Sequence, residues 1–344
     1  MSATTDPVAD GRWRELVERC PEASVFHHPA WLALLRGTYG YAIEACCIAA
    51  PDGRLLAGSP VAEVSSRLTG RRLVALPFSD LCPPLVAPDA PPRTAAALGE
   101  ALESLRRRRG VPLEVRADGE ALDGAAPGER FHHHVVALEP DVDAVTRRFA
   151  RPQMARGVRR AMREGLAVSR RTDRAALVDF YRLHVATRRR LGVPTQPRRF
   201  ILGFEQLFAQ DLGFVLLVHR GQEAIAGAVF LTLGETLFYK YGASDVRWLR
   251  ARPNNLLFME AIRWGCEHAM RSLDLGRTHW GQESLRAFKL GWGAQEHELR
   301  YRYVGGGVPG ARSARGQRAL GTVIRRSPPI AGRVIGEVLY RHAG

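Results

Sequence analysis

The sequence predicts an α/β fold of mixed sheets (α+β) in which one pattern of elements occurs twice in tandem. Three observations support this prediction. Each half of the 344-residue chain contains a β-hairpin, each hairpin leads through another strand into an amphipathic helix, and each helix leads directly into a short strand. A strand, crossover helix and next strand imply a parallel pair within a mixed sheet. Because the copies lie roughly 160 to 170 residues apart, we expect two domains of one fold.

The first copy begins with strands EACCIAA and LLAGSPVAEV, joined by an Asp-Gly turn in PDGR. The strand RRLVALPF follows. An amphipathic helix is then expected over residues 93–109, and the strand PLEVRA around Glu114 follows it. This order sets the pattern with which the second half is compared.

The second copy repeats the order with strands FVLLVH and IAGAVFLTL, then ETLFYKYGA, a helix over residues 254–270 and the strand SLDLGR around Asp274. Ala57-Gly58 and Ala226-Gly227 occupy matching places in the second strand of each hairpin. Both final strands place an acid between two apolar residues. These correspondences support a duplication.

Helical segments and a basic tail complete the predicted organisation. Residues 141–165 predict a helix that ends at Gly165, and a second helix from about Thr172 ends at Gly192. The tail begins with the linker-like GGGVPGARSARG and closes with a short basic, partly apolar helix. We therefore expect a first domain at 1–145, a second domain at 146–304 with an Arg-rich helical entry, and a tail at 305–344.

Composition excludes several classes of protein. Hydrophobic residues make up 46% and charged residues 25%, which is typical of globular chains. No apolar run reaches the roughly 18 residues of a membrane helix, and the N-terminus lacks a secretory pattern, so the expected location is cytoplasmic. The five cysteines form no CxxC pair and are expected to be buried free thiols. No metal site is expected, because successive residues of His132-His133-His134 alternate sides on a strand.

The positive charge is concentrated in one segment. The chain has a formal net charge of +15, and residues 147–199 contain sixteen Arg against three acids. Such a local excess is an electrostatic footprint for a polyanion, and the alternative is a solvated helix face. Only two of the fifty Lys and Arg residues are Lys, namely Lys240 and Lys289. Because ammonium and guanidinium groups are not interchangeable, both lysines are candidates for special positions.

Several strings between Phe26 and Tyr303 resemble the FemABX family of aminoacyltransferases and its wider FemAB-related, BioF2-like GNAT branch. They are FHHPAWLALLRGTYGY, LPFSDLCPPL, RRAMREGLAV, FYRLHVATRRRLGVPTQPRRF, YKYGAS, LDLGR and FKLGWG. The resemblance implies tandem GNAT-like domains that form an amide with an amino acid taken from aminoacyl-tRNA. The long helical arm of some peptidoglycan enzymes is missing. The expected acceptor is therefore an amine of a phosphorylated cell-envelope precursor or of a small metabolite, with peptidoglycan in doubt.

The resemblance also suggests site residues. Lys289 in the FK motif is expected to stabilise the oxyanion. Asp274 is the second expected catalytic residue, because it ends a strand beside the cleft of the second domain and could orient the amine. Phe288 is expected to stack on the terminal adenosine of the donor. Arg190, in the string formed with Thr187 and Gly192, is expected to bind an acceptor phosphate.

Further residues are expected to bind the two substrates. The acceptor pocket is expected to include residues of both halves, namely Tyr239, Tyr241, Ser244, Ser79 and Asp80. If YKYGA is a strand, Tyr239 and Tyr241 face one side and Lys240 the other. Donor or tRNA contacts are expected from the arginines of one helix, namely Arg156, Arg159, Arg160 and Arg163. No resident cofactor is expected.

Two alternatives of different kinds remain open. One is an acyl-CoA-dependent GNAT N-acyltransferase in envelope polysaccharide biosynthesis. Such enzymes bind pyrophosphate through a glycine-containing loop at a helix N-terminus, but SDVRWLRARPNN at that place has no glycine. The other is a non-catalytic nucleic-acid-binding protein, although no helix-turn-helix or zinc-finger spacing is present. The basic tail would also permit peripheral contact with a membrane.

Overall fold

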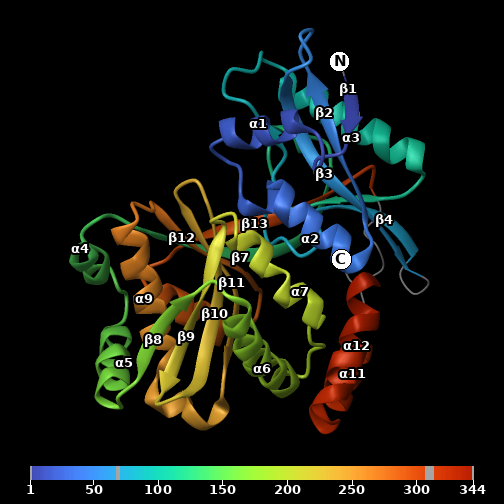
Figure 1. Cartoon of the computed structure of the whole chain (residues 1–344). Helices are drawn as coiled ribbons and strands as arrows, with labels where there is room; N and C mark the ends of the chain where they lie inside the picture. Colours follow the sequence, from blue (N-terminus) through green and yellow to red (C-terminus); the bar gives the residue numbers. More distant parts are fainter. Residues whose placement is uncertain (1, 67–69, 307–313, 343–344) are drawn as a thin grey trace. The chain divides into compact units, whose positions relative to one another are not determined.

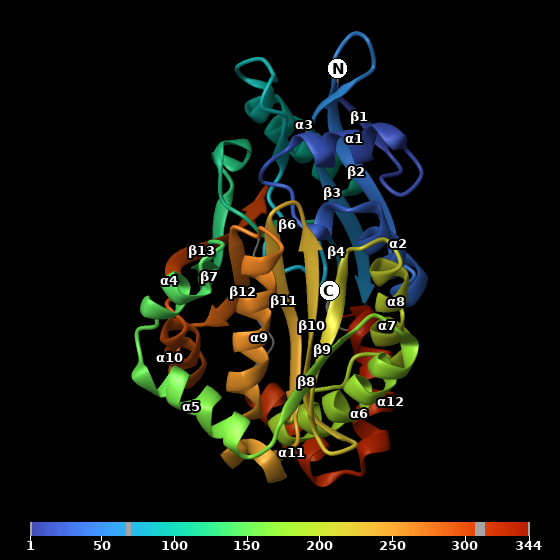
Figure 2. The same cartoon turned by 60° about the vertical axis from the view of Figure 1, so that its left-hand side comes forward.

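The computed structural model describes residues 2–66, 70–306 and 314–342, and it divides the chain into two compact units (Figures 1 and 2). The first unit comprises 1–131, 298–312 and 338–344, and the second comprises 132–297 and 313–337. Strands β7 (Ala126–Ala137) and β13 (Gln295–Val304) each contribute residues to both units. For this reason the units do not follow the contiguous segments 1–145, 146–304 and 305–344.

The first unit contains the first copy of the repeated pattern. Its strands follow the order β1-β2-β3-β4-β6-β13, with β4 and β6 parallel and β5 paired with β3. Helix α3 packs on β2 and β3 and contributes Leu98, Leu102 and Leu105 to the core. The bounds are β1 (Ser2–Thr5), α1 (Gly11–Arg19), α2 (Pro29–Tyr39), β2 (Ala42–Ala49), β3 (Leu55–Ser66), β4 (Gly70–Ala75), β5 (Leu85–Val86), α3 (Thr94–Arg109) and β6 (Leu113–Val115).

The second unit contains the second copy, with strand order β7-β12-β11-β10-β9-β8. Strands β11 and β12 are parallel, whereas β10 pairs antiparallel with both neighbours. The predicted hairpin, third strand, helix and short strand are all present. The strand bounds are β8 (Ala167–Arg171), β9 (Gly213–Arg220), β10 (Glu223–Leu233), β11 (Thr236–Ser244) and β12 (Ser272–His279).

The helices of the second unit lie on both sides of its strands, with α9 on one side and α6 on the other (Figure 1). Their bounds are α4 (Val142–Arg147), α5 (Pro152–Arg163), α6 (Arg174–Leu191), α7 (Arg198–Leu202), α8 (Phe204–Phe208), the 3-10 helix η3 (Val246–Ala251), α9 (Pro253–Glu267), α10 (Glu283–Gly291), α11 (Ala314–Arg326) and α12 (Pro329–Leu339). The single helix expected over 141–165 is wrong. Pro152 has no N–H to donate and starts α5 at its first turn, so the segment forms two helices.

The mixed α/β fold class predicted from the sequence is confirmed. In each unit, the strands before and after the crossover helix form a parallel pair, namely β4 with β6 and β11 with β12. The acidic residue of the second strand occupies a corresponding place in both pairs. Glu114 pairs with Val74 on β4, and Asp274 pairs with Phe238 on β11. Helix α6 ends at Gly192 in the left-handed conformation, as its sequence predicts. The five cysteines are free and buried, also as predicted.

Helix α5 lies close to α9 because a glycine faces the contact. A Cβ atom on Gly157 would come within 2.6 Å of the side chain of Asn255, which lies in α9. The amide of Asn255 in turn lies 3.5 Å from the carbonyl oxygen of Met154. This close approach places the arginines of α5 beside the first turn of α9. Within the described residues, no helix has the length and apolar character needed to cross a bilayer.

Two buried histidines make stability depend on pH. His27 Nε2 lies 2.9 Å from the carbonyl oxygen of Pro83, and His184 Nε2 lies 2.6 Å from Oε1 of Gln196. Burial disfavours the charged imidazolium and lowers the pKa from 6.5 to about 4 for His27 and to about 3 for His184. Both rings therefore stay neutral in the folded protein at pH values where the unfolded chain takes up a proton.

We expect the free energy of unfolding to fall as the pH decreases from about 6.5 towards 4. The stabilisation is complete above the unfolded pKa, and each histidine contributes a loss of roughly 1.4 kcal/mol per pH unit below it. Urea unfolding at pH 7, 6 and 5 measures this pH dependence of the free energy of unfolding. The His184→Gln variant should lack the contribution of one histidine to that dependence. A free energy of unfolding that stays constant across this range would contradict the assignment.

Candidate active site

In the second unit, two parallel strands pair only over their first residues. Strands β11 and β12 pair over residues 236–238 and 272–274, and within the described residues no further pair joins them. Strand β11 nevertheless continues to Ser244 and β12 to His279. The first cavity described below is lined by residues of β10 and β11, and its described lining residues include none of β12.

The first cavity, here called the strand cavity, has a volume of about 320 Å³. It is lined by parts of α6, β10, β11, α9 and α10, namely Thr187, Arg190, Gly227, Ala228, Tyr239, Gly242, Ala243, Ser244, Asn254, Leu257, Phe258, Ser284, Leu285 and Phe288. A Cβ atom on Gly242 would come within 1.9 Å of the Tyr239 hydroxyl oxygen. The absence of a side chain at Gly242 therefore makes room for this hydroxyl.

The second cavity, here called the basic cavity, has a volume of about 790 Å³. Its lining includes five arginines, supplied by the start and body of α5 and by the residue before α9, namely Arg151, Arg156, Arg160, Arg163 and Arg252. The described residues of its lining include no acid. Asn254, Ser284 and Phe288 line both this cavity and the strand cavity. The two cavities thus have a common wall.

The first turn of α9 adds to the positive potential of the basic cavity. Arg252 precedes the helix with φ of 63°, and Pro253, Asn254 and Asn255 line the cavity from the first turn. The N-terminus of a helix carries partial positive charge and unsatisfied N–H groups, so it favours anions. A helix N-terminus together with five guanidinium groups is suited to phosphate groups.

Among the titratable residues that line the strand cavity, Tyr239 has a clearly raised pKa. Its ring packs against Phe230 and Phe258, with centroids 5.7 and 4.9 Å away. Burial raises the pKa of Tyr239 to about 12, so its hydroxyl keeps its proton at neutral pH. The described lining residues of this cavity contain no carboxylate and no histidine. The cavity can therefore position reactants and donate a hydrogen bond, but it offers no strong base.

Tyr241 does not share a face with Tyr239, so this prediction is wrong. The pairing of β10 with β11 shifts between Val229 and Phe230, which leaves Lys240 as an extra residue. A bulge of this kind changes which face the next side chain occupies. Tyr241 consequently contacts residues of α6, α7 and α8, namely His184, Phe200 and Phe204, at ring centroid distances of 5.6 to 6.2 Å.

Thr187 holds the end of β11 against α6. Its hydroxyl donates to the carbonyl oxygen of Ser244 at 3.1 Å and accepts from the Ser244 backbone N–H at 3.0 Å. Both residues line the strand cavity, as does the exposed Arg190 one helical turn further along α6. The expected acceptor residues Arg190, Tyr239 and Ser244 are therefore brought together.

Lys289 lies on α10, where only 4% of the residue is exposed. Its ammonium group donates to the carbonyl oxygens of Gly276 and Arg277, at 2.9 and 3.0 Å. The neighbouring Phe288 lines both cavities, whereas Lys289 lines neither. The structure thus places the expected oxyanion partner in contact with the end of β12.

Asp274 is likewise engaged within the fold. Its Oδ1 accepts from the backbone N–H of Gly276 at 2.7 Å and lies 2.9 Å from Nε2 of His133. Asp274 lines neither cavity. His132 and His134 point to the opposite side of β7, towards Glu296, which confirms the expected alternation along this strand.

The remaining predicted residues divide between the two units. Ser79 and Asp80 belong to the first unit, where the Ser79 hydroxyl donates to the Leu76 carbonyl at 2.6 Å and the Asp80 carbonyl accepts from Tyr301. In the second unit, Arg156, Arg160 and Arg163 line the basic cavity, whereas Arg159 of the same helix does not.

Six polar residues of the cavity walls were not predicted from the sequence, namely Arg151, Gln153, Arg252, Asn254, Asn255 and Ser284. The string RARPNN contains three of them, but the prediction took account only of its lack of a glycine. Its informative signal was the Pro at the first turn of a helix, preceded by Arg and followed by two Asn residues.

Comparisons with known proteins agree with this architecture. Residues 148–297 match a family model described as an acetyltransferase (GNAT) domain. The structure resembles the crystal structure of FemX, with a TM-score of 0.66 and 15% identity over 87% of this chain and 96% of that chain. No curated protein matches the chain by sequence.

Two further solved structures have related folds. L-PGS from Bacillus licheniformis matches with a TM-score of 0.57 and 13% identity over 92% of this chain and 97% of that chain. A tandem GNAT protein from the clavulanic acid biosynthesis pathway matches with a TM-score of 0.54 and 12% identity over 90% and 100%. At these identities the likeness establishes the fold, and this fold agrees with the tandem GNAT-like arrangement predicted from the motifs. The match at residues 148–297, a little less than half of the chain, identifies that segment as a GNAT domain.

Proposed function

We propose that this acyltransferase forms an amide bond by moving an aminoacyl group from aminoacyl-tRNA to an amine of a cell-envelope precursor or small metabolite. The observation that carries this proposal is the common wall of the basic and strand cavities, made by Asn254, Ser284 and Phe288. A donor whose phosphates lie among the arginines can extend past this wall and present its ester in the strand cavity.

The arginines favour a donor with several phosphates along a chain. Arg151, Arg156, Arg160 and Arg163 extend over three turns of α5, and Arg252 lies at the start of α9. A guanidinium group binds phosphate oxygens through paired N–H donors. The 3′ end of a tRNA presents successive phosphates followed by the esterified ribose, which suits a row of arginines next to a reaction site. Phe288 on the common wall offers an aromatic face for the terminal base.

The reaction itself needs few groups from the protein. The acceptor nitrogen attacks the ester carbonyl carbon and loses a proton. A C–N bond forms, the C–O bond to the ribose breaks, and the ribose oxygen leaves as a hydroxyl after gaining a proton. Holding the two reactants in contact supplies much of the acceleration. In this proposal, Tyr239 of the strand cavity stays protonated because its pKa is about 12 and donates a hydrogen bond to the leaving oxygen.

Acyl-CoA is the second candidate donor, and the GNAT domain match favours it. The basic cavity also lies at the N-terminus of the helix that follows the third strand of the repeated pattern, where a pyrophosphate would be bound. The segment before α9 has Arg252 in the left-handed conformation and no glycine-containing loop. This departure is why we place aminoacyl-tRNA first.

Donor competition tests the proposal. Purified protein is incubated with a pool of charged tRNAs or with acetyl-CoA, together with amines extracted from bacterial cells, and mass spectrometry records the mass added. We expect amino-acid masses from charged tRNA, and about a hundredfold less product with Tyr239→Phe. Acetyl transfer without aminoacyl transfer would favour the second candidate. Binding of tRNA with no product from either donor would indicate a non-catalytic nucleic-acid-binding protein.

A further inference from the structure

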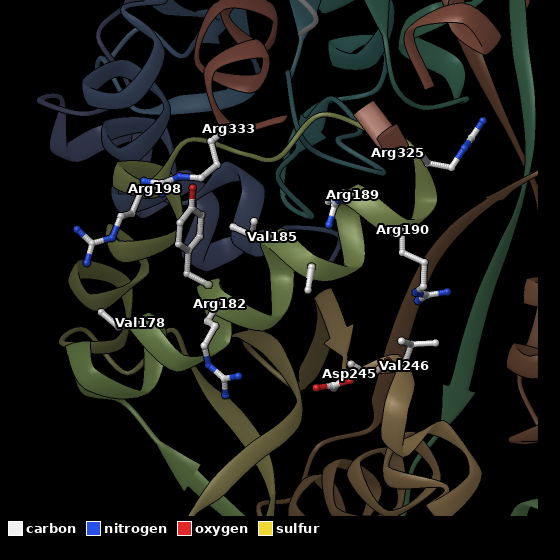
Figure 3. Close-up of a pocket in the computed structure, with 13 residues that line it drawn as sticks. Val178, Arg182, Val185, Arg189, Arg190, Arg198, Asp245, Val246, Arg325 and Arg333 are labelled. Atoms are coloured by element: carbon white, nitrogen blue, oxygen red, sulfur yellow. The ribbon is translucent and has the colours of Figure 1, made fainter. Parts of the chain in front are cut away.

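A third cavity, here called the tail cavity, lies between α6, α7, the start of η3 and the C-terminal helices α11 and α12 (Figure 3). Its volume is about 870 Å³. Six arginines from three parts of the chain line it, namely Arg182, Arg189, Arg190, Arg198, Arg325 and Arg333. Two of them, Arg325 and Arg333, come from the tail that follows the repeated domains.

Acids balance only a small part of the charge of these six arginines, because a single carboxylate is among the described lining residues. Within the described residues, no ion pair joins any of the six to a carboxylate, because their resolved partners are neutral. Arg182 donates to the carbonyl of Ala224 at 2.7 Å, and Arg189 donates to that of Ser327 at 2.9 Å. The one acid among the described lining residues, Asp245, accepts from Arg247 at 2.9 Å, and the Arg247 hydrogen bond together with the nearby charge of Arg182 lowers the pKa of Asp245. Gathering uncompensated cations is unfavourable unless an anion binds among them.

The other walls of the tail cavity are apolar. Val178, Val185 and Val246 line it, and the ring of Tyr181 lies below the guanidinium of Arg333 at 5.8 Å. Val178 and Val246 are 39% and 59% exposed, so apolar surface reaches the rim. A ligand that fits such a cavity carries a phosphate group attached to an apolar portion.

Helix α12 continues this apolar surface. Its Gly332 and Gly336 face Thr195, since a Cβ atom on Gly336 would come within 1.8 Å of the Thr195 carbonyl oxygen. At about 100° per residue, Ile330 and Val334 fall on the opposite face of the helix, with Arg333 between the two faces. Ile330 and Val334 are 64% and 58% exposed. The helix is thus packed on one face and apolar on its solvent face.

We propose that the face formed by α6, the start of η3 and α11–α12 docks on an anionic lipid surface, and that the tail cavity receives the phosphate headgroup of one lipid. Uncompensated arginines beside exposed aliphatic side chains match the two layers of such a surface. RNA would use the same cations, but its interfaces are polar and give no role to Ile330 and Val334. The proposal does not depend on which acyl group the enzyme transfers.

Co-sedimentation with vesicles tests the proposal on the full chain. We expect binding to phosphatidylcholine vesicles that contain phosphatidylglycerol, and little binding to phosphatidylcholine alone. Each arginine near an anionic bilayer contributes roughly fivefold to association, so Arg325→Gln/Arg333→Gln should weaken binding about 25-fold. Ile330→Gln/Val334→Gln should weaken it as well, whereas added salt should affect only the arginine-dependent part.

Matched controls separate docking from net charge and from folding. Arg107→Gln/Arg108→Gln on α3 removes the same charge from exposed positions of the first unit and should leave vesicle binding within twofold. Thermal unfolding and transfer to a water-soluble amine should be unchanged in both the Arg325→Gln/Arg333→Gln and the Ile330→Gln/Val334→Gln variants. Equal binding by all variants would overturn the proposal. So would binding of inorganic pyrophosphate or RNA through Arg325 and Arg333 by a protein that ignores anionic vesicles.

Discussion

Replacing three arginines of the basic cavity, Arg156→Gln/Arg160→Gln/Arg163→Gln, is expected to weaken binding of aminoacyl-tRNA roughly 100-fold. The three side chains come from one helix and line the cavity at the start of α9. Contacts between exposed arginines and phosphates contribute roughly 1 kcal/mol each, and 1.4 kcal/mol corresponds to a factor of ten. Filter binding or fluorescence anisotropy of a labelled charged tRNA measures the change.

Salt dependence identifies the origin of that change. Each phosphate contact of a single strand adds about 0.7 to the slope of the log of the binding constant against the log of salt concentration. The triple variant should therefore flatten the slope by roughly 2. A smaller flattening would mean that the arginines act as a diffuse positive field and do not contact individual phosphates.

Arg159→Gln supplies the matched control. Arg159 is exposed on the same helix, yet it does not line the basic cavity. Its replacement should change affinity less than a single replacement at Arg156, Arg160 or Arg163. An equal loss at Arg159 would contradict a role for the cavity and would favour the solvated, generally basic helix face. Repeating the series with acetyl-CoA shows whether the same arginines bind that donor.

The order of elements could be predicted because each copy carries local signals that act within a few residues. Alternating apolar residues, the Asp-Gly turn of the first hairpin and the glycine after α6 each specify a conformation without help from distant parts of the chain. The duplication then supports each assignment twice. Pro152 is a local signal of the same kind, because a proline at this place indicates the start of a new helix. The helical pattern on both sides of it favoured one continuous helix instead.

Which residues line the cavities depends on the register of the strands and on contacts between distant parts of the chain, and neither can be read from local sequence patterns. The extra residue at Lys240 shifts one strand against its neighbour and turns Tyr241 towards α6. The position of Asp274 in its strand predicted an acid that faces the cleft. In the structure, the carboxylate of Asp274 contacts His133, which lies 141 positions earlier in the chain. Contacts between such distant residues follow from the fold, so strand alternation alone wrongly placed Tyr239 and Tyr241 on one face.

Lys289→Met is expected to lower the free energy of unfolding of the second unit by about 2 kcal/mol, because the Gly276 and Arg277 carbonyls lose their donor in a buried setting. Methionine keeps the length of the side chain and removes its charge. Lys289→Arg should also destabilise, since a bulkier planar fork has to fit where only 4% of the residue is exposed. An arginine-rich chain would then keep a lysine at this position because the buried space around the side chain is too small for a guanidinium group.

Activity should fall together with stability in both Lys289 variants. The two carbonyls fix the end of β12, and α10 supplies Ser284 and Phe288 to the common wall of the cavities. Loosening this segment should lower kcat and raise KM for the donor, whereas Lys240→Met, which replaces the chain's other lysine, should leave both nearly unchanged. Urea unfolding and steady-state kinetics on the same preparations distinguish a structural role of Lys289 from a role at the oxyanion. An unchanged free energy of unfolding with a hundred- to thousandfold loss confined to kcat would instead assign Lys289 to the oxyanion.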